Sequence, residues 1–266
     1  MADPLAVVPP FLPVFVAALL LPFVGRRVGH ALGLLATGAV VPYVWLTGEG
    51  AHLPVKLFGF DAVLYNVDPF STLMGLIFGF IGAVGVLYSY YSEAPAIQTA
   101  FALSYVAASL GAVFGGDWLS LVFFWELMAI TSTLLVWHYG GRAVRAGFRY
   151  ALLHGVGGTL LLGAVVWHYV EVGSFLFTAA GGGMAGAVAP VLAALGIGVN
   201  VGFIGLHAWL PDTYPRPHVA ASVFLCVYTT KTGVYGMYRA FPDGNVAIAY
   251  MGGLMAVFGA TYALFQ

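Results

Sequence analysis

Residues 200–239 read NVGFIGLHAWLPDTYPRPHVAASVFLCVYTTKTGVYGMYR. An apolar run enters this stretch, a polar turn broken by prolines interrupts it between His207 and His218, and a second apolar run with Lys231 follows. A lysine in the middle of a helix long enough to cross a bilayer is energetically costly, and such a residue usually has a function. The stretch therefore predicts two membrane helices joined by a polar turn, with a functional cation in the second.

The composition of the whole chain agrees with a membrane location. Of its 266 residues, 61% are hydrophobic and only 7% are charged, whereas soluble domains carry about 25% charged residues. A net charge of −1 gives no indication of a nucleic-acid partner, and none is expected. The single cysteine, Cys226, excludes a disulfide framework and a cysteine metal site, and we expect it to be a small buried hydrophobic residue.

The length of the apolar runs predicts an all-α polytopic membrane protein, since a membrane helix needs about 20 apolar residues. We expect nine spans, at 5–24, 28–47, 69–91, 96–115, 118–139, 146–170, 187–209, 218–240 and 246–265. The first is expected to be a membrane helix rather than a signal peptide, because no basic leader precedes it. The polar gap at 47–68 predicts a short β-hairpin outside the bilayer.

The arginines of the short loops predict the orientation, because positive loops stay in the cytoplasm. If nine helices alternate, three loops on one side hold Arg26, Arg27, Arg142, Arg145, Arg149 and Arg216. The opposite side receives only Lys56 and Arg239. The arginine loops are therefore expected in the cytoplasm and the N-terminus outside.

Four polar residues are expected near the middle of the bilayer, namely Glu126, His154, Asn200 and Lys231. A carboxylate, an imidazole and an ammonium at one depth are the parts of a proton relay. Two alternatives remain open. Glu126 and Lys231 would also suit one buried structural ion pair that transports nothing, and His154 would also suit a hydrogen bond within the core.

Glycines are dense around Asn200, at positions 196, 198, 202 and 205. Glycines at this density either allow two helices to pack closely or mark an unwound segment that lines a cavity. The sequence does not choose between these two structures.

Three motifs resemble the antiporter-like subunits of respiratory complex I, membrane-bound hydrogenases and multisubunit sodium/proton antiporters of the Mrp type. They are LHAWLPDTYPRPHVAASVFLCVYTTKTGVYGMYR, LSLVFFWELM and VLYNVDPFSTLM. The PDTYP version of the first motif is most similar to the Mrp D-type branch. The resemblance covers essentially the whole chain.

The resemblance implies roles for individual residues. Glu126 matches the family's glutamate that modulates the proton pathway, and Lys231 matches the lysine that passes protons toward the membrane centre. Asn200 stands where the family usually has a lysine, seven residues before His207 of the HAWLPD block. Glu126 therefore needs another partner, for which Lys231 and His154 are the candidates.

The resemblance also implies a division of the chain. The family has two inverted five-helix repeats, each forming half of a channel, and this chain resembles the first half. We expect helices one to three with the hairpin at 1–95, a half-channel repeat of helices four to eight at 96–241, and the start of the second half at 242–266. Another subunit is then expected to supply the second half-channel, unless the chain is a fragment.

The predicted function is that of a proton-conducting subunit, or a proton/sodium antiport subunit, in a multisubunit complex of the cell (inner) membrane. The predicted pathway contains Glu126, His154, Asn200, His207 and Lys231. The chain by itself is not expected to be an enzyme, although its complex could be redox-driven, and no metal, flavin or haem is expected. The expected partners are other antiporter-like subunits, protons and the bilayer. Two rivals are a structural subunit that has lost its pump and a subunit that supplies protons to an uptake protein.

Overall fold

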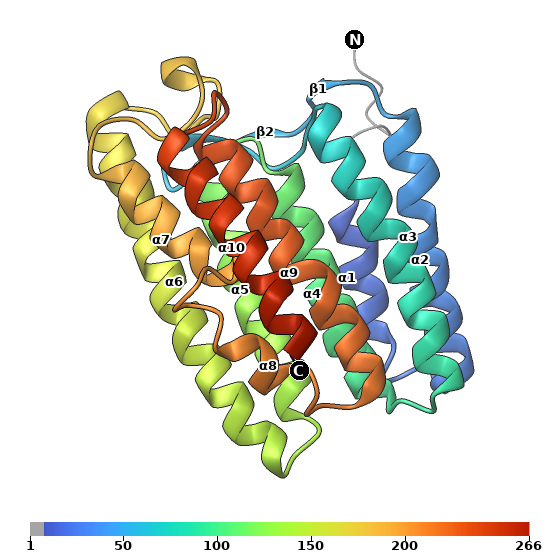
Figure 1. Ribbon diagram of the computed structural model, residues 1–266. Helices are drawn as coiled ribbons and strands as arrows, with labels where there is room; N and C mark the ends of the chain where they lie inside the picture. The colour runs from blue at the N-terminus through green and yellow to red at the C-terminus, as the bar shows by residue number, and fades with distance from the viewer. Residues whose placement is uncertain (1–7, 266) are drawn as a thin grey trace.

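The structure is a computed structural model that describes residues 8–265 (Figure 1). Part of the expected first span, 5–24, and Gln266 lie outside the described residues. The helices are α1 (Phe11–Leu20), α2 (Arg26–Leu46), α3 (Pro69–Tyr91), α4 (Ala96–Phe114), α5 (Trp118–Trp137), α6 (Arg142–Val172), α7 (Ala189–Val201), α8 (Trp209–Thr213), α9 (Val219–Ala240) and α10 (Val246–Phe265). The expected all-helical membrane fold is confirmed.

Helix starts follow from local caps. The Asp68 carboxylate accepts hydrogen bonds from the backbone N–H groups of Phe70 and Ser71, and Pro69 occupies the first turn of α3. These side-chain bonds satisfy N–H groups that have no partner within the helix. The start of α3 at Pro69 agrees with the expected span at 69–91.

Asp117 caps α5 and also binds the 47–68 segment to the bundle. Its carboxylate accepts hydrogen bonds from the backbone N–H groups of Ser120 and Val63, each at 2.7 Å. Asp117 is completely buried. Burial raises its pKa although these hydrogen bonds act in the opposite direction.

The 47–68 segment forms two small antiparallel sheets, which confirms the expected hairpin. β1 (Gly50–Ala51) pairs with β4 (Asn66–Val67), and β2 (Pro54–Leu57) pairs with β3 (Phe60–Val63). Both sheets lie at the same end of the bundle as the α6–α7 connection (Figure 1).

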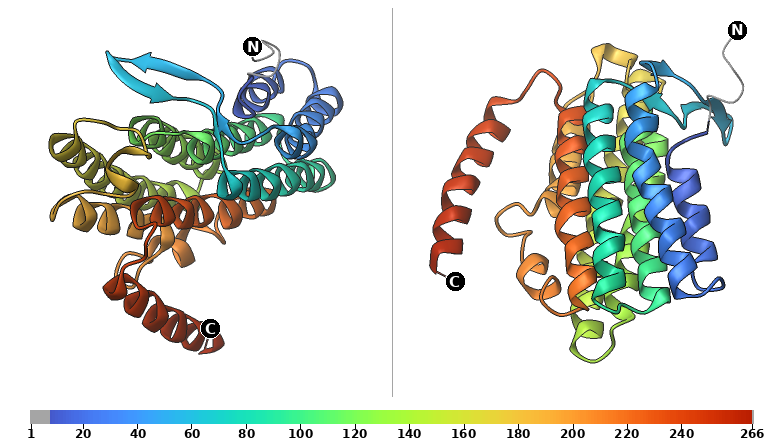
Figure 2. Two further views of the ribbon diagram at one scale, coloured as in Figure 1. Left: turned by 90° about the horizontal axis from the view of Figure 1, so that it is seen from above. Right: turned by 90° about the vertical axis from the view of Figure 1, so that its right-hand side faces the viewer.

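α4 is the central helix of the bundle. It packs against α1, α2, α3, α5 and α9, and most of its side chains are buried. α10 stands apart from the other helices and is joined to α9 by a short connection (Figure 2).

The expected continuous span at 187–209 is wrong. α7 ends at Val201, because Gly202 adopts a left-handed conformation (φ +83°) and both Gly202 and Phe203 donate backbone hydrogen bonds to the carbonyl of Gly198. An L-residue with a side chain rarely adopts this conformation, so glycine ends the helix here. The chain then turns and forms the short helix α8.

Five of the described helices are long and apolar enough to cross a bilayer by themselves, namely α2, α3, α4, α5 and α6. α1 and α7 are shorter. α9 is long enough, but the polar run Thr229–Thr232 lowers its hydropathy. α6 begins at Arg142 rather than at the expected 146, since an amphipathic turn extends it beyond the apolar run.

The arginines expected in loops lie at one end of the bundle, in the first turns of α2 and α6 or in the α8–α9 connection. The α1–α2, α5–α6 and α8–α9 connections are at the bottom of Figure 1, opposite both sheets. This arrangement agrees with the alternation from which the orientation was predicted. Which end faces the cytoplasm stays a prediction.

Candidate functional site

Glu126 lies on α5 beside α6. It is half-buried, and its carboxylate fits into the space left by Gly158, where an added Cβ atom would overlap it. The same carboxylate lines a cavity of about 270 Å³ between the two helices, with Ala129, Ala151 and Gly155 among the other lining residues. No described residue forms a hydrogen bond or an ion pair with it.

Lys231 lies on an exposed face of α9, and its Nζ donates a hydrogen bond of 2.7 Å to the backbone carbonyl of Cys226. Among the described residues, no ion pair contains Lys231 or Glu126. The structural Glu126–Lys231 pair that the sequence left open is therefore not formed. Cys226 is exposed as well, which corrects the expected burial. It lies on a side of α9 that no other described helix covers. An apolar run of sequence does not indicate which side of a helix will be covered.

His154 is buried in the core. Its Nδ1 donates to the carbonyl of Tyr150 at 2.9 Å if the ring is neutral, which leaves the Nε2 lone pair as an acceptor. Nε2 is buried and has no partner among the described residues. The ring is held between Tyr150, stacked at a centroid distance of 3.9 Å, and the edge of Trp209 at 4.6 Å.

Asn200 is completely buried on α7, and neither atom of its side-chain amide has a partner among the described residues. Its backbone packs against Gly233 of α9, where an added Cβ would lie 3.3 Å from the Asn200 carbonyl carbon. On the other side of α7, Gly196 packs closely against Gly157 of α6. The glycines around Asn200 thus serve both expected purposes, since Gly196 permits close packing and Gly202 unwinds the helix.

A chain of hydroxyl groups crosses the core beside His154. Ser132 and Tyr150 are hydrogen-bonded at 2.8 Å, Tyr150 and Thr229 at 3.2 Å, and Thr229 is also hydrogen-bonded to Tyr105. These four residues come from α5, α6, α9 and α4, and all are buried. The sequence did not predict this chain, because buried serine, threonine and tyrosine on apolar helices are usually satisfied locally.

His207 lies in the turn between α7 and α8. Its Nδ1 is buried without a partner among the described residues, and the residue lines a cavity of about 620 Å³ with Gly202, Ile204 and Phe258 of α10. Buried polar atoms without a partner also occur on Thr213, Tyr214 and Thr232. Buried polar groups of this kind are usually satisfied by bound water, so the α6–α9 region is a suitable place for ordered water.

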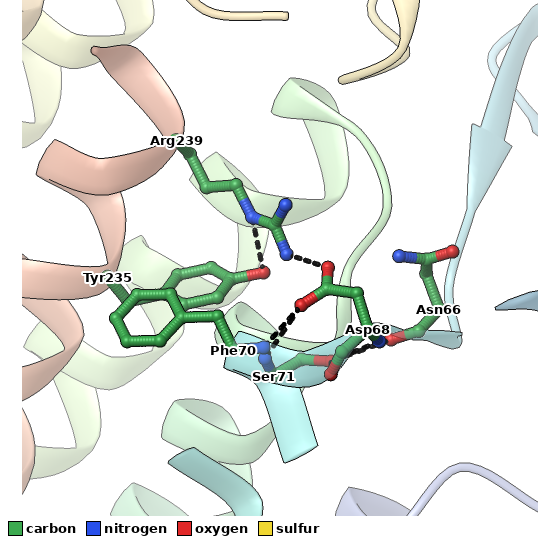
Figure 3. A network of polar contacts seen from close by, with 6 residues as sticks. All are labelled: Asn66, Asp68, Phe70, Ser71, Tyr235 and Arg239. Carbon is green, nitrogen blue, oxygen red and sulfur yellow. Dashed lines mark hydrogen bonds and ion pairs between the residues drawn. The ribbon is translucent and has the colours of Figure 1, made fainter. Parts of the chain in front are cut away.

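A different kind of charged site lies where α3 begins and α9 ends (Figure 3). Asp68 at the start of α3 forms an ion pair with Arg239 near the end of α9. The Arg239 guanidinium also donates a hydrogen bond of 2.9 Å to the hydroxyl of Tyr235, and it lies 5.1 Å from the ring centroid of Phe177. Asp68 and Arg239 are both paired here, so we interpret this site as a structural contact between α3 and α9.

The structure thus brings His154, Asn200 and the hydroxyl chain into one region and leaves Glu126 and Lys231 at its margins. Within residues 8–265, histidine, cysteine and carboxylate side chains do not gather in groups that could hold a metal ion. The arrangement can move protons between hydroxyl groups, imidazole and water.

Comparison with known proteins gives a family match. Residues 115–266, more than half of the chain, match the transmembrane family described as NADH:quinone oxidoreductase/Mrp antiporter. The D component of the Na(+)/H(+) antiporter of Bacillus subtilis (strain 168) is 28% identical over 227 residues, which cover 79% of this chain and 45% of that protein. The chain thus spans less than half the length of this relative.

Solved structures share the fold. A chain in the archaeal membrane-bound sulfane sulfur reductase superimposes with a TM-score of 0.80 at 23% identity, covering 96% of this chain and 46% of that one. A chain of respiratory complex I from Thermus thermophilus gives a TM-score of 0.77 at 21% identity, covering 97% of this chain and 58% of that one.

Proposed function

Because the chain belongs to the NADH:quinone oxidoreductase/Mrp antiporter family of membrane subunits, we propose that it conducts protons as half of an ion-translocating module. The named relatives include components of cation/proton antiporters. The observation that carries the proposal is the buried hydroxyl chain with an unpartnered imidazole beside it.

The hydroxyl chain has the chemistry that proton transfer requires. Each hydroxyl group both donates and accepts a hydrogen bond, so a proton entering at one end can be passed on by reorientation of its neighbours. The chain is buried and therefore shielded from competing solvent. His154 stacks on Tyr150 and presents a free Nε2 acceptor at the same place.

Asn200 has a different role in this pathway from a lysine. An amide does not titrate near neutral pH, so Asn200 cannot carry a proton, but its donor and acceptor atoms can orient water. His154 is the titratable group that stacks on the hydroxyl chain, and its imidazole can both accept and donate a proton. This assignment accommodates the absence of the lysine that the family resemblance implied.

Glu126 and Lys231 are the proposed exits from the hydroxyl chain. Glu126 faces the cavity between α5 and α6, and Lys231 lies on the uncovered face of α9. A charge on an uncovered face at the middle of a membrane helix needs a polar partner. We propose that a second antiporter-like unit covers this face and continues the pathway from Lys231.

The test is proton movement in vesicles that contain the assembled complex. Tyr150→Phe removes the central hydroxyl of the chain, and we expect transport to fall about tenfold or more, because a phenyl ring can neither donate nor accept the proton. Tyr228→Phe is the matched control, because Tyr228 is an equally buried tyrosine, and among the described residues its hydroxyl bonds only the Phe78 carbonyl, at 2.8 Å. Equal transport in the two variants would reject the hydroxyl chain.

Glu126→Gln and Lys231→Ala test the exits in the same vesicles. We expect both to reduce transport per assembled complex while the complex stays intact. Full transport in both variants would remove these residues from the pathway. Reduced assembly with unchanged transport per complex would support a structural subunit instead. Repeating the assay with an imposed sodium gradient shows whether sodium is exchanged for protons.

A further inference from the structure

An arginine cluster surrounds a cavity at the end of the bundle opposite the sheets. The cavity has a volume of about 490 Å³, and four of its lining side chains are guanidinium groups. They are Arg142, Arg145, Arg149 and Arg216. A second cavity of about 560 Å³ shares Gly141, Arg142 and Arg216 with the first. The two cavities together form one indented basic surface.

The charges on this surface are not balanced. Asp212 binds Arg149 at 2.9 Å and Arg216 at 2.6 Å. Arg142 and Arg145 form no ion pair with any described residue. Like charges that share a cavity repel one another, so an anion bound between them lowers the electrostatic free energy.

The start of α6 strengthens the same preference. Gly141 precedes the helix and provides no side-chain cap, and the first turn contains no acidic residue. The backbone N–H groups of a helix start carry a partial positive charge. The arginines and this helix end therefore favour one anion with several acceptor oxygens, and a phosphate group has this chemistry.

The surroundings of the cluster indicate where the phosphate comes from. Val144, Phe148 and Leu152 lie one turn apart on α6, and 47%, 55% and 54% of their respective surfaces are exposed. They form an apolar strip that runs from the cluster along the helix. A free phosphate ion would gain nothing from contact with this apolar strip, whereas the acyl chains of a phospholipid would cover it.

We propose that the arginine cluster binds the headgroup of an anionic phospholipid, with its phosphate between Arg142, Arg145 and Arg216. The acyl chains lie along Val144, Phe148 and Leu152. The bound lipid reduces the positive charge of the cluster and holds α6 against the α8–α9 connection, which Asp212 already links to α6 through its ion pairs with Arg216 and Arg149.

The experiment measures lipid retained by the chain after transfer to a mild detergent, by native mass spectrometry. The probes are phosphatidylglycerol and phosphatidylcholine supplied in equal amounts, with and without inorganic phosphate. We expect the chain to retain phosphatidylglycerol in preference to phosphatidylcholine. In Arg142→Gln/Arg145→Gln this preference should fall about 30-fold, or about fivefold for each arginine.

Two controls separate the site from net charge and from misfolding. Arg27→Gln removes an exposed arginine from the start of α2, at the same end of the bundle, and the preference should remain. Arg142→Lys/Arg145→Lys keeps the charge and should keep most of the preference. If the double glutamine variant retains phosphatidylglycerol like the unmodified chain, the site does not exist. If millimolar inorganic phosphate displaces the lipid from the unmodified chain, the occupant is a free anion and the lipid proposal is wrong.

Discussion

Two sets of opposite charges occur in this bundle, and they differ in whether they are paired. Asp68 and Arg239 are 171 positions apart in sequence, yet they form an ion pair with further hydrogen bonds around it (Figure 3). Glu126 and Lys231 are closer in sequence and lie within their helices, yet neither has a charged partner among the described residues. A charged pair with further hydrogen bonds around it holds its two helices in one arrangement. An unpaired charge within the bilayer region does not add to stability.

This difference separates structural charges from candidate functional ones. Asp68 also caps α3, and Arg239 also contacts aromatic rings, so each has several reasons to be where it is. Glu126 and Lys231 have no such structural reason. They therefore stay the candidates for the proposed proton pathway.

The largest expected effect is on the paired set. Asp68→Ala removes the cap of α3 and leaves the mostly buried Arg239 without its carboxylate, so the free energy of unfolding should fall by about 2–3 kcal/mol. Asp61→Ala is the control, because the Lys56–Asp61 pair is 73% exposed on both sides and should contribute less than about 1 kcal/mol. Denaturant unfolding in detergent micelles measures both. Equal losses would show that the Asp68–Arg239 pair is no more important than a surface pair.

A smaller effect is expected where Glu126 meets α6. Gly158→Ala places a Cβ atom where the Glu126 carboxylate lies, so this flexible side chain must move to another rotamer, which should cost about 1 kcal/mol. Gly155→Ala is on the same helix with nothing within 4 Å of the added atom, so it should be neutral or slightly stabilising. The same unfolding measurement compares the two variants. If Gly158→Ala in a Glu126→Ala background is no better tolerated, the carboxylate is not the group that is displaced.

The smallest effect is expected for the unpaired set. Glu126→Gln and Lys231→Gln break no ion pair, so each should change the free energy of unfolding by less than about 0.5 kcal/mol. A loss of several kcal/mol in either variant would reveal a hidden structural partner. Small changes in stability together with reduced proton movement would complete the contrast with Asp68 and Arg239.

Much of the fold was determined by the sequence alone. The starts of α3, α4 and α5 were predicted to the residue, and the hairpin at 47–68 was predicted from its alternating pattern. These features depend on caps, prolines and run lengths, which act between neighbours in sequence. The family was also recognisable from its motifs, since these lie within continuous stretches of the chain.

Only the tertiary structure decided which side of each helix faces the core. Membrane helices are apolar on all sides, so periodicity does not indicate the inward face. For this reason Cys226 was wrongly expected to be buried, and Lys231 could not be assigned to a partner. The hydroxyl chain links Tyr105 to Thr229 across 124 positions of sequence, and only the packing of four helices brings its members within hydrogen-bonding distance.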